Sequence, residues 1–111
     1  MNQTSKNILL VSGSGQNVGK TSFICQLIAQ NTALHFAAIK ITPHFHAPTE
    51  GLRPVIVTDH FRIFQETDPY TTKDSSRFLL AGAKLVFYIL TTDAFLKEAF
   101  MLTSRQIAPD Q

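Results

Sequence analysis

The stretch Gly13-Ser14-Gly15-Gln16-Asn17-Val18-Gly19-Lys20-Thr21 decides how the rest of this chain is arranged. It follows the apolar run Ile8-Leu9-Leu10-Val11 and leads into a segment whose apolar residues, Phe23, Ile24, Leu27 and Ile28, recur at helical spacing. A buried strand, a glycine-rich turn and an amphipathic helix in this order form an anion site, because the loop N–H groups and the helix N-terminus point toward the same place. The stretch therefore predicts a phosphate-binding loop.

Each part of the predicted loop has a chemical role. Lys20 is expected to place its ammonium against the outer phosphates, and Thr21 to offer its hydroxyl to Mg²⁺. Ser14 stands six residues before Lys20, where the strict pattern has glycine, so the loop is expected to be one residue longer or differently bent. The alternative is a glycine-rich turn that binds nothing. The predicted nucleotide-binding residues are Gly13, Ser14, Gly15, Gln16, Asn17, Val18, Gly19, Lys20, Thr21 and Ser22.

Apolar runs and turn residues predict the remaining elements. Strands are expected at 34–41 and 84–90, and helices at 74–81 and 94–102. Residues 52–67 read as a β-hairpin turning at Asp59-His60, with a single long strand as the alternative. Asp74 or Ser75 is the expected N-cap of one helix and Asp93 of the other, while Gly82 ends the first. The predicted class is α/β: a P-loop NTPase-like three-layer fold with a mostly parallel sheet, incomplete, and an inserted hairpin.

Lys40 ends the second predicted strand, at the edge where parallel α/β sheets bind ligands. We therefore take Lys40, with Lys20, as a candidate catalytic residue. Residues 42–54 follow as a proline-rich loop that contains His44, His46 and Glu50. These three side chains suggest a metal site, but two imidazoles do not define one. A loop that contacts the nucleotide or a partner is the alternative that we favour.

Composition limits the function classes. The 111 residues suit one domain, and a net charge of +2 without a basic run argues against nucleic acid or a membrane surface as a partner. No apolar run has the length of a membrane span, and no signal peptide is recognisable. The single cysteine, Cys25, excludes an intrachain disulfide and is expected to be an inert thiol in the first helix. A cytoplasmic location fits these features.

Three motifs together carry a family resemblance. They are the loop at 13–21, Lys40 with histidines beyond it, and Lys73-Asp74-Ser75-Ser76-Arg77 followed by Ala81-Gly82-Ala83. This combination resembles the MobB family over most of residues 8–90. MobB proteins are P-loop GTP-binding proteins of the SIMIBI class, often dimeric, that assist the guanylyltransferase attaching GMP to the molybdenum cofactor.

The resemblance implies Mg²⁺ and GTP as cofactors, a guanylyltransferase as partner and a homodimer. It also implies a group of cofactor- or partner-binding residues: His44, His46, Lys73, Asp74, Ser75 and Arg77.

The chain departs from the family pattern in three places. Ile41 stands where the family has histidine after the lysine, and the hairpin at 52–67 is expected to be an insertion. The family also has a later strand that ends in an acidic residue helping to hold Mg²⁺, and this chain shows none. Asp59 and Asp93 follow apolar runs and are the available substitutes. Otherwise the chain is a fragment, or a partner subunit supplies the acid.

No water-orienting group with a matching cation is identifiable, so we expect slow GTP hydrolysis or none.

Two further function classes stay open. The spacing of Gly13 from Lys20 also resembles dethiobiotin synthetase, an ATP-dependent ligase, and the guanine-specific Asn-Lys-x-Asp sequence is absent. The remaining alternative is a non-catalytic adaptor that binds its partner through the hairpin and strand edges.

Overall fold

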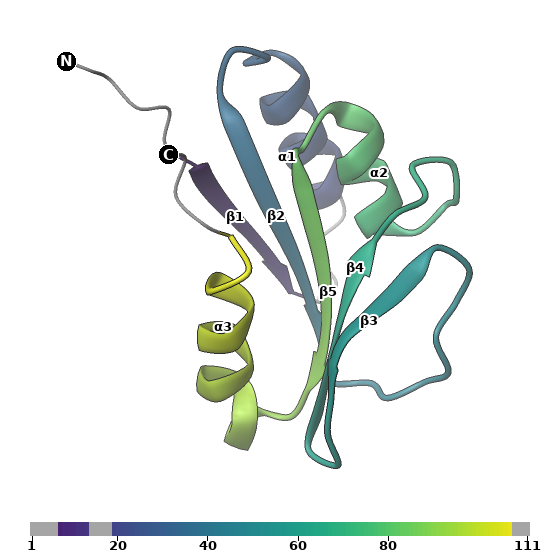
Figure 1. The fold of residues 1–111 in the computed structure, drawn as a ribbon. Coiled ribbons are helices and arrows are strands. Elements are labelled where there is room, and N and C mark those ends of the chain that lie inside the picture. The colour runs from purple at the N-terminus through teal and green to yellow at the C-terminus, as the bar shows by residue number, and fades with distance from the viewer. Residues whose placement is uncertain (1–6, 14–18, 108–111) are drawn as a thin grey trace, which may run out of the picture.

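The computed structural model describes residues 7–13 and 19–107, which form an α/β structure around one five-stranded sheet (Figure 1). The strand order across the sheet is β1-β2-β5-β4-β3. In chain order the elements are β1 (Asn7–Gly13), α1 (Lys20–Ala29), β2 (His35–Thr42), β3 (Leu52–Val57), β4 (Phe61–Glu66), α2 (Asp74–Ala81), β5 (Leu85–Thr91), the short 3₁₀ helix η1 (Asp93–Phe95) and α3 (Leu96–Ser104).

The sheet is mixed. β1 pairs with β2 and β2 with β5 in parallel, whereas β4 pairs with β5 and β3 with β4 in antiparallel. The predicted hairpin is confirmed as β3 and β4, and the single long strand is wrong. The expectation of a mostly parallel sheet is wrong as well, because the hairpin joins the sheet directly beside β5. The consecutive parallel strands β1 and β2, joined through α1, confirm the predicted strand–helix–strand unit.

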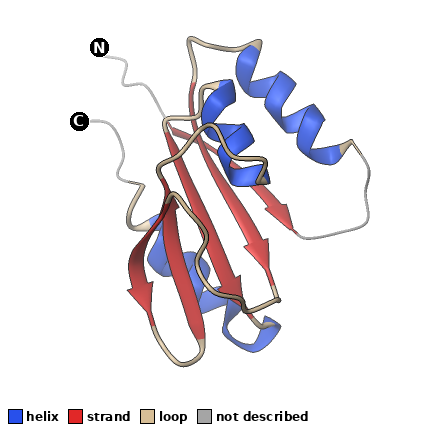
Figure 2. Ribbon diagram, turned by 90° about the vertical axis from the view of Figure 1, so that its right-hand side faces the viewer, coloured by secondary structure: helices blue, strands red, loops and turns tan. Residues whose placement is uncertain are grey.

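Helices cover both faces of the sheet. Helices α1 and α2 lie on one face and α3 on the other, as Figure 2 shows. Ile28 and Phe78 pack from α1 and α2 against Val86, while Ala99 of α3 packs against Ile89. Alternating residues of β5 therefore face opposite layers, as expected for a strand buried on both sides. In the part of the chain that the structure describes, no helix is both long and apolar enough to cross a bilayer.

Helix ends differ from the sequence-based expectations. The N-cap of α2 is Lys73 and no side chain caps it, so the prediction of Asp74 or Ser75 is wrong. Both side chains are instead hydrogen-bonded to groups from other elements. Asp93 begins η1 and does not cap α3, whose N-cap is Phe95. Gly82 ends α2 at φ 120°, which confirms the predicted C-cap, since glycine alone adopts such a φ without strain.

One row of side chains leads across the sheet to the functional region. Ser12, Lys40, Tyr88 and Phe64 are register neighbours on β1, β2, β5 and β4. They lie two residues beyond Leu10, Ala38 and Val86, which pack against α1 and α2, so strand alternation places the row on that same face. The row therefore lies near the carboxyl ends of β1 and β2, where α1 begins. We call this side of the sheet the α1/α2 face.

Candidate functional site

Lys40 and Asp74 form the centre of the candidate site. The Lys40 Nζ atom lies 2.8 Å from Asp74 Oδ2 and 3.4 Å from the main-chain oxygen of Gly13. The Thr21 side chain lies beside Asp74 and favours the charged form of its carboxyl. These contacts bring together the ends of β1 and β2 and the first residues of α1 and α2. The sequence predicts Gly13 and Thr21 in the phosphate loop and Lys40 at the ligand-binding end of a strand, and the structure adds Asp74 to them.

The surroundings of Asp74 keep its carboxylate charged. Burial alone would raise the pKa of Asp74, but the hydrogen bond and charge of Lys40 oppose it, helped by the Thr21 hydroxyl and the Arg77 charge. Together these groups hold the pKa of Asp74 below its ordinary value. The two side chains are only 13% and 30% exposed, so water screens the pair less than it screens a surface ion pair. Asp74, the first residue of α2, is thus a negatively charged oxygen ligand beside the start of α1.

The predicted phosphate loop borders this cluster. Its residues 14–18 (Ser14, Gly15, Gln16, Asn17 and Val18) lie outside the described residues. Gly19 has φ 89°, a left-handed conformation that suits glycine, and precedes α1. Lys20 and Ser22 are exposed on the first turn of α1, and Arg77 Nη2 donates a hydrogen bond to Ser22 Oγ at 3.1 Å. The structure therefore brings Arg77, the last residue of the motif at 73–77, beside the predicted loop.

Lys73 and Ser75 turn away from this cluster toward Glu66, a residue that sequence analysis missed. The Ser75 hydroxyl lies 2.6 Å from Glu66 Oε1, and Lys73 Nζ lies 3.0 Å from the same oxygen. A signal was present in the sequence, because Glu66 follows Phe64 at the strand period of two. Strand alternation thus places this carboxylate in phase with a buried phenylalanine.

The loop 43–51 follows the α1/α2 face away from the end of β2. The guanidinium of Arg62 lies 5.5 Å from the centre of the Phe45 ring, and His46 Nε2 lies 3.2 Å from the Tyr88 hydroxyl. Burial, then the charges of Asp74 and Glu66, raise the pKa of Tyr88, so its hydroxyl stays protonated. His44 contributes its backbone N–H, which donates a hydrogen bond to Thr42 Oγ1.

The less favoured alternative for this loop, a metal site, has no support from the geometry of the described residues. Among residues 7–13 and 19–107, no group of three or more His, Cys, Asp and Glu side chains is arranged to hold a metal ion. His46 is directed to Tyr88 and to the oxygen of Ala47, whereas Glu50 contributes its main-chain oxygen to Lys73. His46 therefore serves to hold the loop against the sheet.

The two acids proposed as substitutes, Asp59 and Asp93, lie in different parts of the structure. Asp59 is exposed in the turn between β3 and β4. Asp93 lines cavities on the α3 side of the sheet, one of which also includes Gly13. Asp74 is the carboxylate that contacts Thr21, and the sequence assigned it only a cofactor or partner role.

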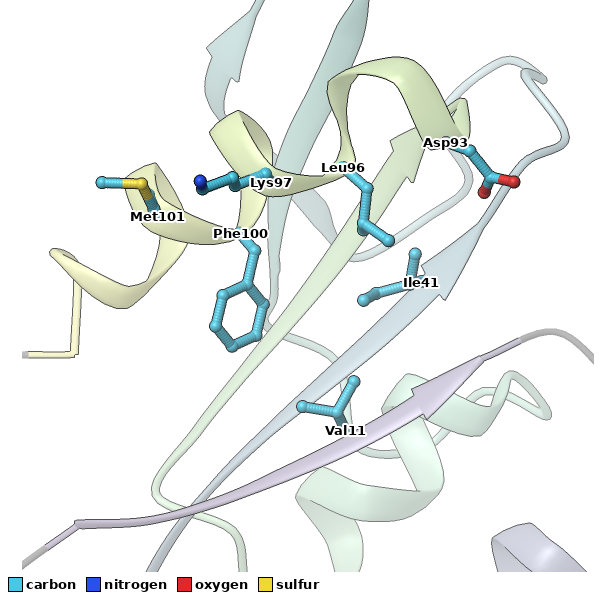
Figure 3. Close-up of a pocket in the computed structure, with 7 residues that line it drawn as sticks. All are labelled: Val11, Ile41, Asp93, Leu96, Lys97, Phe100 and Met101. Carbon is cyan, nitrogen blue, oxygen red and sulfur yellow. The ribbon is translucent and has the colours of Figure 1, made fainter.

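An apolar groove occupies the opposite face. It lies between α3 and the strands β1 and β2, has a volume of about 490 Å³, and is shown in Figure 3. Val11, Ile41 and Phe100 are directed into it, with Asp93 and Lys97 at its margin. Because Val11 and Ile41 are odd-numbered residues of β1 and β2, they point away from Lys40 and the α1/α2 face. The groove is separate from the candidate site.

Cys25 is a half-buried residue of the α1–α2 layer. Burial raises the pKa of its thiol; the Arg77 charge lowers it and the Asp74 charge raises it, with a net increase. A raised pKa leaves little thiolate at neutral pH, so the thiol is a poor nucleophile. This agrees with the inert role expected from the sequence.

Comparison of the chain with protein-family models, with curated proteins and with solved structures finds no match. The resemblance to MobB therefore rests on the quoted motifs alone, and the functional assignment rests on those motifs together with the geometry of the site.

Proposed function

We propose that this chain is a Mg²⁺-dependent GTP-binding protein with a P-loop NTPase-like fold that assists molybdopterin-guanine dinucleotide synthesis. The observation that carries the nucleotide assignment is the meeting of Thr21, Lys40 and Asp74 beside the Gly19-Lys20-Thr21 sequence. A strand, a glycine-rich loop and a helix N-terminus present backbone donors for phosphate oxygens, and Lys20 supplies the mobile positive charge. The choice of GTP, the role in cofactor synthesis and the guanylyltransferase partner rest on the resemblance.

The donors around Thr21 fit a magnesium ion. Thr21 and Asp74 offer hard oxygen atoms, and Asp74 is held in its charged form. Mg²⁺ in nucleotide sites takes one or two protein oxygens and completes its shell with phosphates and water. A pair of ligands is therefore sufficient, and a third protein carboxylate is not needed. When bound, the ion neutralises charge on the outer phosphates.

Lys40 has two roles in the proposal. Without nucleotide its ammonium is paired with Asp74, which offsets the cost of holding a half-buried carboxylate. A bound terminal phosphate would offer Lys40 a second anion at the carboxyl end of β2. A lysine exchanging between carboxylate and phosphate responds to the nucleotide state. Within the described residues we assign no water-orienting group, so slow hydrolysis or none remains the expectation.

Titration with fluorescent GTP and ATP analogues tests the function. We expect Mg²⁺-dependent binding that prefers GTP and weakens by about 1.5–3 kcal/mol in Lys20→Ala, which loses a charge-assisted contact. Lys84→Ala, at an exposed lysine just before β5, is the control and should bind as the wild type does. Preference for ATP would support the ligase-like alternative. Partner binding that needs no nucleotide and survives Lys20→Ala would support the adaptor.

A further inference from the structure

Glu66 is a buried charged side chain that the proposed nucleotide chemistry does not use. Its side chain has no exposed surface, and in the part of the chain described it is the sole charged residue among the buried ones. Burying a carboxylate costs several kcal/mol unless partners compensate it. Glu66 ends β4 on the α1/α2 face, where Phe64 and Ser75 are its buried neighbours. Its partners therefore show what the buried charge is used for.

The partners of Glu66 lie on both sides of Asp74 in the sequence. Oε1 accepts from the Ser75 hydroxyl at 2.6 Å and pairs with Lys73 Nζ at 3.0 Å. Oε2 accepts from the backbone N–H of Asp68 at 3.2 Å. The Glu66 carboxylate thus holds Lys73 and Ser75, the residues on either side of Asp74. Through Asp68 it also holds the segment between β4 and α2.

This arrangement fixes the direction of the Asp74 side chain. Successive residues of a helix point roughly 100° apart, so a helix that directs Ser75 at Glu66 directs Asp74 sideways. Asp74 then meets Lys40 of β2 and Thr21 of α1, which both lie far from it in the sequence. No side chain caps the helix at Lys73, so capping does not set the orientation of this first turn.

The same carboxylate also holds the end of the loop 43–51. Lys73 Nζ, paired with Glu66, donates to Thr49 Oγ1 at 3.0 Å and to the main-chain oxygen of Glu50. Gly51 lies so close that a Cβ atom there would be 2.6 Å from Glu66 Oε2. The Thr67 N–H donates to the Gly51 oxygen at 2.8 Å. The loop therefore ends on the same group of atoms that directs Asp74.

We infer that Glu66 is a positioning residue: through Ser75 and Lys73 it directs Asp74 at the nucleotide site and holds the loop 43–51 beside that site. The inference rests on the proposed function for the role of Asp74. Glu66 itself touches neither nucleotide nor ion in this account. Its loss should therefore weaken the contribution of Mg²⁺ and leave the phosphate contacts of the loop and Lys20 in place.

Fluorescent GTP titrations with Mg²⁺ and with EDTA separate the Mg²⁺ contribution from the phosphate contacts. They are carried out on Glu66→Gln and Ser75→Ala. We expect affinity in EDTA to stay within about twofold of the wild type, while the gain from Mg²⁺ falls by about tenfold or more, the usual effect of losing a group that orients a metal ligand. Glu98→Gln, an exposed glutamate on α3, is the matched control and should keep the full gain. An unchanged gain in both Glu66→Gln and Ser75→Ala overturns the inference. Ser75→Ala keeps the Glu66–Lys73 pair and decides the question if Glu66→Gln does not fold.

Hydrogen exchange on the nucleotide-free protein separates this inference from the proposed function. We expect the hydrogen-bonded amides next to the two segments, Leu52 and Thr67 at the end of the loop 43–51 and Arg77 in the first turn of α2, to exchange at least about tenfold faster in Glu66→Gln, while those of β5 stay protected. Unchanged exchange in both segments overturns the role of Glu66 even if nucleotide binds. Wild-type protein that binds no nucleotide overturns the proposed function, and the exchange rates still decide whether Glu66 holds the loop and the start of α2.

Discussion

The ammonium of Lys40 lies 2.8 Å from the carboxylate of Asp74, 34 residues later in the chain, and the pair joins the end of β2 to the start of α2. The Thr21 hydroxyl lies beside the same carboxylate and helps to lower its pKa. Two segments for which the sequence predicts different roles thus meet in one place.

The Lys40–Asp74 pair makes stability depend on pH. The folded-state pKa of Asp74 lies below its ordinary value of 3.8, so the pair stabilises the fold above that pH. The contribution is lost as the pH falls through the lower, folded-state pKa. We expect Asp74→Asn to cost about 1 kcal/mol at pH 6–7 and progressively less in acid. Urea unfolding of the wild type and of Asp74→Asn, from neutral to acid pH, measures this difference in the free energy of unfolding.

A double-mutant cycle with Lys40→Met separates the pair from other effects of the Asp74 charge. Asp74 lies in the first turn of α2, where a negative charge also favours the helix dipole. In the Lys40→Met background we expect the pH-dependent cost of Asp74→Asn to be much smaller. An equal cost in both backgrounds would assign the effect to the helix and not to the ion pair.

Gly51→Ala is expected to be unusually destabilising. Gly51 has φ 90°, and a Cβ atom there would lie 2.5 Å from Asp68 Cβ and 2.6 Å from Glu66 Oε2. The backbone strain alone is worth about 1–3 kcal/mol, and the steric overlap adds to it. Gly82→Ala is the control, because Gly82 has φ 120° but its added Cβ would meet only Ile28 Cγ2 at 3.7 Å. Equal free energies of unfolding for the two variants would show that the overlap at Gly51 has no cost.

The α1–α2 layer is expected to depend on Phe78. Its side chain is fully buried between the sheet and α1, so Phe78→Ala leaves a cavity and should cost about 3–5 kcal/mol. Leu80, two residues later on the same helix, is 61% exposed, and Leu80→Ala should change stability by less than about 0.5 kcal/mol. Chemical denaturation of both variants tests the packing; a small effect at Phe78 would contradict this placement of α2.

The sequence predicted the elements well because hydrophobic period and glycine position act locally. The strand before the loop, the helix after it, the hairpin and the end of α2 at Gly82 all follow from such signals. Local signals do not predict where the hairpin joins the sheet. Its pairing beside β5 depends on which buried face Phe61, Ile63 and Phe64 fill, and that is decided by the assembled sheet.

The site was predicted in part for the same reason. Lys40 at a strand end and Thr21 in the loop are recognisable from sequence position. Asp74 was interpreted as a helix cap or partner residue because its neighbours in space are not its neighbours in sequence. The buried role of Glu66 was missed because a glutamate at a strand end is usually exposed. Of the two acidic residues that follow apolar runs, Asp59 is exposed in the hairpin turn, whereas Asp93 lines a cavity with Gly13 on the α3 side of the sheet.

The most direct test of the account is the effect of Mg²⁺ on GTP affinity in the wild type and in Asp74→Asn. We predict that Mg²⁺ tightens binding to the wild type by about tenfold or more and that Asp74→Asn loses most of this gain, because the carboxylate beside Thr21 is the proposed protein ligand. Asp59→Asn, in the exposed hairpin turn, should behave as the wild type. A wild type that binds no nucleotide, or an Asp74→Asn variant that keeps the full gain, would contradict the account.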